Sequence, residues 1–206
     1  MFDNVKSEDF GQQVDYKNLS SIRSVDYPSE QNTESSLTRN SEFTNDRTIL
    51  VNQQRDTSQL PVSVFDVALY ILKQLKHPCS TMKLHKLLYY CQAWSLVWDD
   101  RPLFSQRIEA WANGPVVRNL FNFHKGMYEI SAQDMSIGDE RNLSQEQKDT
   151  IDTVLNYYGS KNVQWLINQT HIEKPWREAR KGLSPDERGT NEISLDSMTE
   201  YYSSLK

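Results

Sequence analysis

The sequence has little of three features that would assign a class at once: cysteine, long apolar runs and an excess of positive charge. Its two cysteines, Cys79 and Cys91, are twelve residues apart, which matches neither a metal knuckle nor a redox pair. No apolar run approaches the ~18 residues that span a bilayer, and the N-terminus lacks the basic start and apolar stretch of a secretory signal. We therefore expect a cytoplasmic protein without a membrane partner, whose thiols are reduced and whose Cys91 lies in the core.

The charge balance is acidic. Lysine and arginine number 23 against 28 aspartate and glutamate, which gives a net charge of −5 and a sequence pI of about 5.4. Nonspecific nucleic-acid binding depends on cations that neutralise phosphates, so this balance argues against a broad phosphate-binding surface. A local basic patch stays open, but nucleic acid is not a favoured partner.

Aromatic and polar residues divide the chain into two parts. All five tryptophans follow residue 90, whereas the first sixty residues contain 26 Ser, Thr, Asn or Gln and no tryptophan. Such a segment has too little apolar surface to offset the entropy of folding alone. Residues 1–60 are therefore predicted to be a polar N-terminal arm, disordered or ordered by a partner, and residues 61–206 to be one folded domain.

The second part has the periodicity of helices. Apolar spacing and capping signals predict helices over residues 63–76, 81–98, 115–124, 144–158, 162–170 and 194–203, a short helix opening at Pro175, and a strand over residues 107–112. Gly159 is expected to end one helix in a left-handed conformation, and Pro115 to begin another. The fold class is mainly α, a compact bundle of about six helices with a short β element.

The stretch over residues 83–117 is the most informative segment. Leu84, Leu87, Leu88, Cys91 and Trp94 follow one another at offsets of three and four, which gives the predicted helix an apolar face. Tyrosine and tryptophan side chains also lie on its other sides. We therefore predict that this helix is more buried than an ordinary surface helix.

Catalytic and metal-binding patterns are weak. The sequence has no HExxH motif and no glycine-rich phosphate loop, and Cys91 has no local base to activate it. His77, Cys79 and His85 could contribute to a metal site, but core-edge or solvated side chains are the favoured interpretation. No enzyme activity, cofactor or metal is predicted.

Two further binding patterns are weighed against structural interpretations. Gly114 and Pro115 could precede an anion-binding helix end, but a tight turn is favoured. The cluster around Trp176, Arg177 and Arg180 could contact nucleic acid, but nearby acids favour a mixed-charge surface. The first two predicted helices could be mistaken for a DNA-reading helix-turn-helix, but the second is filled with Leu, Tyr and Trp instead of polar side chains that reach base edges.

Several ordered blocks together resemble a known family. They are KLHKLLYY at 83–90, Pro-Leu-Phe at 102–104, Glu-Ala-Trp at 109–111, Gly-Pro-Val-Val at 114–117, and the later run from 151 to Trp176. In this order they resemble the Panacea antitoxin domain, a family that includes SocA-like proteolytic adaptors, over about residues 62–202. His85 departs from the usual glutamine, and Asn113 from the usual aromatic or small residue.

The resemblance implies a domain without catalytic activity that neutralises a cognate toxin protein by direct binding. The alternative it implies is an adaptor that delivers a bound toxin or client to a AAA+ protease such as ClpXP. A DNA-binding regulator is the third and least favoured hypothesis. Family membership does not identify the toxin, because members pair with unrelated ones.

Twelve residues of the matching blocks are the candidate partner-binding set. They are Lys83, His85, Lys86, Tyr89, Tyr90, Glu109, Trp111, Gly114, Pro115, His171, Pro175 and Trp176. The aromatic residues and the Gly-Pro turn also have a structural interpretation as core and geometry. Lys83, His85 and Lys86 are the stronger contact candidates, because charged groups are rarely buried without a partner. Lys86→Glu is accordingly expected to weaken partner binding without unfolding the domain, whereas Trp111→Ala is expected to destabilise it.

Overall fold

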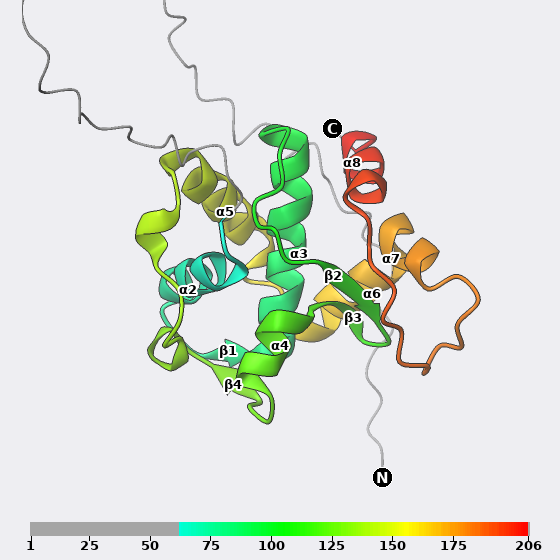
Figure 1. Ribbon diagram of the computed structural model, residues 1–206, viewed down its shortest axis with the longest axis horizontal. Helices are drawn as coiled ribbons and strands as arrows, with labels where there is room; N and C mark the ends of the chain where they lie inside the picture. The colour runs from blue at the N-terminus through cyan, green and yellow to red at the C-terminus, as the bar shows by residue number, and fades with distance from the viewer. Residues whose placement is uncertain (1–61, 206) are drawn as a thin grey trace, which may run out of the picture.

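The computed structural model describes residues 62–205, and the predicted arm of residues 1–60 lies outside them. The mainly α fold is confirmed, with seven α-helices and two small antiparallel sheets in the described part (Figure 1). The helices are α2 (Val64–Leu75), α3 (Thr81–Trp98), α4 (Arg118–His124), α5 (Gln145–Tyr158), α6 (Val163–Ile172), α7 (Lys174–Ala179) and α8 (Leu195–Ser203). The strands are β1 (Cys79–Ser80), β2 (Ile108–Trp111), β3 (Gly114–Val117) and β4 (Glu129–Ile130), and two short 3-10 helices cover Ala132–Asp134 and Glu140–Asn142.

Helix α3 is the central element of the domain. It contacts α2, α5, α6, α8 and strand β3, and it runs through the middle of the molecule in Figure 1. Fourteen of its eighteen residues are buried, so its side chains face protein on every side rather than along one stripe. The prediction that this helix is more buried than a surface helix is confirmed.

A buried aromatic cluster joins α3 to three other helices. The rings of Tyr90 and Tyr158 stack at 3.9 Å with an interplanar angle of 11°. The hydroxyls of Tyr90 and Tyr202 donate to the two carboxylate oxygens of Glu173, at 3.2 and 2.8 Å, and Glu173 is fully buried. A buried carboxylate needs such donors, so these bonds fix α8 and the start of α7 against α3. Cys91 is fully buried beside this cluster, as predicted.

Helix ends follow the predicted caps with one exception. Ser63 and Asp66 form a capping box at the start of α2, and Ser144 caps α5 in the same way. Gly159 was expected to be left-handed, but its φ of −63° is right-handed. Lys76, the residue that caps the end of α2, is left-handed, with φ 61°.

Strands β2 and β3 form a hairpin, and this corrects the prediction that a helix begins at Pro115. Pro115 lies within β3 opposite Ala110, and helix α4 begins only at Arg118. The N–H of Ala110 points away from β3 and donates to Asn191 O at 2.8 Å. The Ala110–Pro115 pair is therefore a position without ladder hydrogen bonds, where proline loses nothing by lacking an N–H. The predicted strand over residues 107–112 is confirmed as β2.

Candidate functional site

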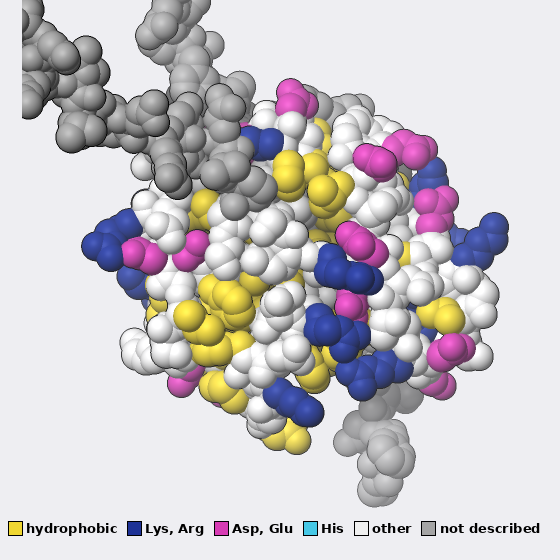
Figure 2. Space-filling view, in the orientation of Figure 1, with side chains coloured by type: hydrophobic (Ala, Val, Ile, Leu, Met, Phe, Trp, Pro, Cys, Tyr) yellow, Lys and Arg dark blue, Asp and Glu magenta, His cyan; other side chains and the backbone are white. Residues whose placement is uncertain are grey.

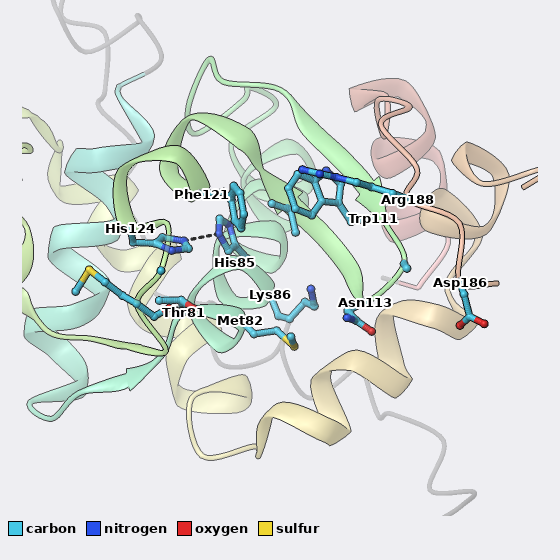
Figure 3. Close-up of a pocket in the computed structure, with 14 residues that line it drawn as sticks. Thr81, Met82, His85, Lys86, Trp111, Asn113, Phe121, His124, Asp186 and Arg188 are labelled. Atoms are coloured by element: carbon cyan, nitrogen blue, oxygen red, sulfur yellow. Dashed lines mark hydrogen bonds between the residues drawn. The ribbon is translucent and has the colours of Figure 1, made fainter. Parts of the chain in front are cut away.

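A pocket of about 440 Å³ opens between the first turns of α3, helix α4 and the β2–β3 hairpin (Figure 3). Its wall is mainly apolar and comes from Met82, Trp111, Val116, Phe121 and Met127. This volume lies within the range of small-ligand and side-chain pockets, and an apolar wall with a few polar groups is their usual composition. The pocket is therefore the candidate binding site.

Two histidines form part of the pocket floor. His85 of α3 and His124 of α4 are both buried, and their Nε2 atoms are 2.8 Å apart. The N–H of Val117 donates to His85 Nδ1 at 3.2 Å, so the proton of the neutral ring is on Nε2. His85 Nε2–H then donates to His124 Nε2, which places the His124 proton on Nδ1.

The surroundings keep both imidazoles neutral. Burial lowers the pKa of His85 well below 6.5, and the nearby His124 and Lys86 lower it further. Burial also lowers the pKa of His124. Protonating His85 on Nδ1 would break the bond from Val117, which joins α3 to the end of β3. The histidine pair is therefore a structural link at neutral pH that acid weakens.

Lys86 is the second group beneath the pocket. Its side chain is fully buried, and its ammonium donates to Pro115 O at 3.0 Å. No carboxylate among residues 62–205 forms an ion pair with it. Burial lowers the pKa of Lys86 from 10.5 to about 7, so the side chain is part neutral at physiological pH.

Gly114 makes room for this lysine. Its φ of 97° is in the left-handed region, and a Cβ at this position would lie 2.6 Å from Lys86 Cε and 2.9 Å from Thr170 Oγ1. Only glycine satisfies both the backbone angle and the close approach. The predicted interpretation of Gly114 as geometry therefore has a specific cause, the packing of Lys86 against the hairpin.

The hairpin side of the pocket rests on a charged cluster around Trp111. Glu109 is 4% exposed and accepts two bonds from Arg118, at 2.8 and 2.6 Å, and one from Trp111 Nε1 at 2.8 Å. Burial alone would raise the pKa of Glu109, but these donors lower it below its usual value. The carboxylate stays ionised and orients the Trp111 ring toward the pocket.

Arg188 stands at the exposed rim of the pocket. Its guanidinium lies 4.5 Å from the centre of the Trp111 ring, and Figure 3 shows the side chain extended over that ring. It makes no ion pair with any residue of the described range 62–205. Figure 2 shows lysine and arginine side chains gathered over the β2–β3 hairpin. A cation at the mouth of an apolar pocket can receive the carboxylate of a bound group.

The C-terminal candidates support the hairpin from behind. The rings of His171 and Trp176 stack at 4.1 Å, and Trp176 Nε1 donates to Trp111 O at 3.0 Å. Arg180 is buried and donates to Ala110 O at 3.0 Å and to carbonyls of the following loop. Trp176 and Arg180 thus hold the backbone of β2, which is a structural role for the cluster weighed above as a nucleic-acid contact.

The structure separates the twelve predicted residues into groups. His85, Lys86 and Trp111 line the pocket; Tyr89, Tyr90, Glu109, Gly114, Pro115 and Pro175 are buried in the scaffold; Lys83, His171 and Trp176 are partly exposed. The expectation that Lys83, His85 and Lys86 are exposed contact groups needs correction, because His85 and Lys86 are buried. Lys83 donates to Gly159 O at 2.6 Å. Both side chains can be buried because Pro115 O accepts from Lys86 and because His85 pairs with His124, contacts that residue type alone does not indicate.

Sequence reasoning missed the groups that form the wall and rim. Phe121 and His124 lie within the helix predicted over residues 115–124, but nothing in their spacing indicated a pocket. Met82, Met127 and Arg188 come from three separate segments, and only the tertiary fold brings them together. An exposed arginine beside one glycine and two acids gives no sequence signal that it lies against Trp111.

The alternative sites considered from the sequence do not assemble. In the described part of the chain no three histidine, cysteine or carboxylate side chains are grouped to hold a metal ion. His85 is directed toward His124 rather than toward Cys79. The anion-site interpretation of Gly114 and Pro115 also required a helix at Pro115, whereas β3 continues there. Within residues 62–205, none of the helices combines the length and apolar character needed to cross a bilayer.

Fold and pocket together define a mainly helical domain built around one buried helix, with an apolar binding pocket at the start of that helix. Residues 84–177 match the family model described as "Antitoxin SocA-like, Panacea domain". The match confirms the resemblance to the Panacea family over this stretch, which runs from α3 into α7. No curated protein and no solved structure matched the chain.

Proposed function

We propose that this protein is an antitoxin, which neutralises a cognate toxin protein by binding it directly, and that it catalyses no reaction. The observation that carries this proposal is the match of residues 84–177 to the SocA-like Panacea model. The pocket supports a binding role, because it combines an apolar wall with Arg188, a cation that forms no ion pair within residues 62–205.

The structure favours a division of the predicted binding residues. Fully buried side chains such as Tyr89 and Tyr90 cannot touch a partner without unfolding α3, so their role is to hold the scaffold. Trp111 and the rim residues are exposed enough to contact a partner. We therefore infer that toxin recognition involves the pocket and its rim, and that His85 and Lys86 act from beneath it.

The test is co-expression with the product of the neighbouring reading frame. Under this proposal that product arrests growth alone, growth recovers when this protein is present, and the two proteins purify as a complex. Arg188→Glu is the informative variant, and Arg177→Glu, on the exposed side of α7, is its matched control. Failure of both rescue and complex formation would refute the antitoxin role.

The same experiment separates the adaptor alternative. An adaptor shortens the half-life of the bound protein in cells that contain the AAA+ protease and has no such effect in cells that lack it. A pure inhibitor leaves the half-life unchanged while still restoring growth. Pulse-chase measurement of the neighbouring gene product in the two strains decides between them.

A further inference from the structure

The aromatic residues of the N-terminal arm have a common neighbour. Each of the five aromatics in residues 1–60 is adjacent in sequence to an aspartate or glutamate. The pairs are Phe2–Asp3, Asp9–Phe10, Asp15–Tyr16, Asp26–Tyr27 and Glu42–Phe43. Two of them belong to the same tripeptide, Val-Asp-Tyr, at 14–16 and 25–27. The arm therefore repeats one chemical pattern, an aromatic ring beside a carboxylate.

The wall of the pocket is complementary to such a ring. Trp111 and Phe121 offer aromatic surfaces for edge-to-face contact, and their own rings already meet at 4.7 Å and 63°. Met82 and Met127 add thioethers, which pack favourably at the edges of aromatic rings. Asn113 lines the exposed side and carries an amide that can bond a tyrosine hydroxyl.

The charges at the pocket are complementary to the carboxylate. Arg188 and Lys86, which is part neutral at physiological pH, line it against one acid, Asp186, although the whole chain has a net charge of −5. The first sixty residues hold ten acids against six bases, so arm and pocket are of opposite sign. Figure 3 places Asp186 at the outer edge of the pocket and Arg188 over Trp111, so the arginine is nearer the apolar wall.

The arm is long enough to reach the pocket. Between Tyr27 and the first described residue, Val62, there are 34 residues. At roughly 3.3–3.6 Å each these extend to about 110–120 Å, whereas a domain of this size has a radius of gyration of about 15 Å. A tether of this kind gives an effective concentration on the order of a millimolar. Even a weak motif is then bound for much of the time.

We propose that the pocket between α3, α4 and the β2–β3 hairpin is a docking site for the Val-Asp-Tyr motif of the chain's own N-terminal arm. The tyrosine ring occupies the apolar well, and the aspartate carboxylate bonds to Arg188. The motif occurs twice, so either copy can fill the single pocket. A partner that uses the pocket must displace it, which makes the arm a built-in competitor. The proposal is independent of the antitoxin role, because both pocket and motif belong to this chain.

Methyl NMR of the methionines in the full chain tests the proposal. Met82 and Met127 line the pocket, while Met135 and Met198 are buried elsewhere and report on general changes of fold. Substituting both motifs, Asp15→Asn with Tyr16→Ser and Asp26→Asn with Tyr27→Ser, should shift the signals of Met82 and Met127 only. The control variant, Asp46→Asn with Asp56→Asn, removes the same charge from acids that have no aromatic neighbour and should leave all four signals unchanged.

A peptide titration provides the second measurement. A peptide of residues 23–30, which contains the second motif, is added to the quadruple arm variant. We expect it to return the Met82 and Met127 signals toward their wild-type positions. A further Arg188→Glu substitution should weaken its binding about tenfold, as expected for reversing one partner of a close charge pair.

Three results overturn the proposal. The first is identical Met82 and Met127 signals in the wild type and the quadruple variant. The second is a peptide that binds equally well with and without Arg188→Glu. The third is a wild-type protein that light scattering shows to be a dimer and that becomes monomeric in the quadruple variant, because the motif would then fill the pocket of a second copy.

Discussion

The buried lysine beneath the pocket leads to a quantitative prediction. Lys86 has no exposed surface, and its pKa falls from 10.5 to about 7 on folding. A tenfold change in proton affinity corresponds to about 1.4 kcal/mol, so protonating Lys86 costs about 5 kcal/mol more in the folded than in the unfolded chain. The perturbation that tests this is Lys86→Met, which keeps the length of the side chain and removes its charge.

The sign of the pH dependence follows from proton counts. Between pH 7 and pH 10.5 the unfolded chain binds a proton at Lys86 and the folded protein does not, so raising the pH stabilises the fold. From pH 7 to pH 9 this group contributes a rise of about 2 kcal/mol in the free energy of unfolding. Below pH 7 both states are protonated, and the group adds no further pH dependence.

Urea unfolding followed by circular dichroism at pH 7 and pH 9 measures the effect. In Lys86→Met the rise between the two pH values should be smaller than in the wild type by about 2 kcal/mol. Contributions from cysteine and tyrosine are the same in both proteins, so the difference isolates Lys86. Lys83→Met is the matched control, because it makes the same substitution at a partly exposed lysine of the same helix.

The second part of this prediction concerns the free energy of unfolding at pH 7. The loss of the bond to Pro115 O costs about 1 kcal/mol, and removal of the buried charge offsets it, so Lys86→Met should be as stable as the wild type or more stable. An unchanged slope, or a loss above about 3 kcal/mol as seen when a buried ion pair is broken, would refute the reasoning. Lys86→Glu, expected from the sequence to spare the fold, should instead unfold it.

Three further perturbations test the scaffold of the site. Gly114→Ala should destabilise the domain by more than about 2 kcal/mol, because the backbone strain and the steric overlap with Lys86 both cost free energy. The control Gly126→Ala is equally left-handed but lies in open space, so it should cost about 1 kcal/mol in the same urea experiment. His85→Gln should reduce the loss of melting temperature between pH 7 and pH 5. The lowered pKa of His85 means that the unfolded chain binds the proton more tightly, so acid favours unfolding of the wild type. An equal loss in the wild type and the variant contradicts this. Glu173→Gln should cost about 1–3 kcal/mol, because an amide, unlike a carboxylate, has only one accepting oxygen for the two buried tyrosine hydroxyls. Glu178→Gln, on the surface, should have little effect. Equal unfolding midpoints for the two variants would exclude a stabilising role of Glu173.

The helices could be predicted from the sequence because local signals mark them. Two helix starts are marked by capping boxes, Ser63 with Asp66 and Ser144 with Gln147, and both form as expected. The crowding of aromatics around α3 correctly indicated a helix more buried than an ordinary surface helix. The prediction failed at Pro115, which is compatible with a helix start and equally with a strand position that needs no donor. Asn191, 81 residues after Ala110, decides between the two by accepting a hydrogen bond from Ala110 N–H.

The candidate site was predictable only in part. Trp111 was singled out from its motif and lies in the pocket wall. The motif could not tell which charged residues would be exposed, because burial of Lys86 depends on the carbonyl of Pro115 and the space left by Gly114. The position of Arg188 at the pocket could not be predicted from the sequence, because its contact with Trp111 joins residues that are 77 positions apart.

The sequence by itself determined the helical class of the domain and its resemblance to the Panacea family, since both depend on periodicity, caps and ordered motifs that are local in the chain. It also determined the contrast in composition between the polar, acidic residues 1–60 and the aromatic remainder of the chain. Only the tertiary structure decided that His85 and Lys86 face inward, that a pocket lies over them, and that Arg188 stands at its mouth against Trp111. Those properties arise from contacts between distant segments, where burial and hydrogen-bond partners, rather than residue type, set what each side chain can do.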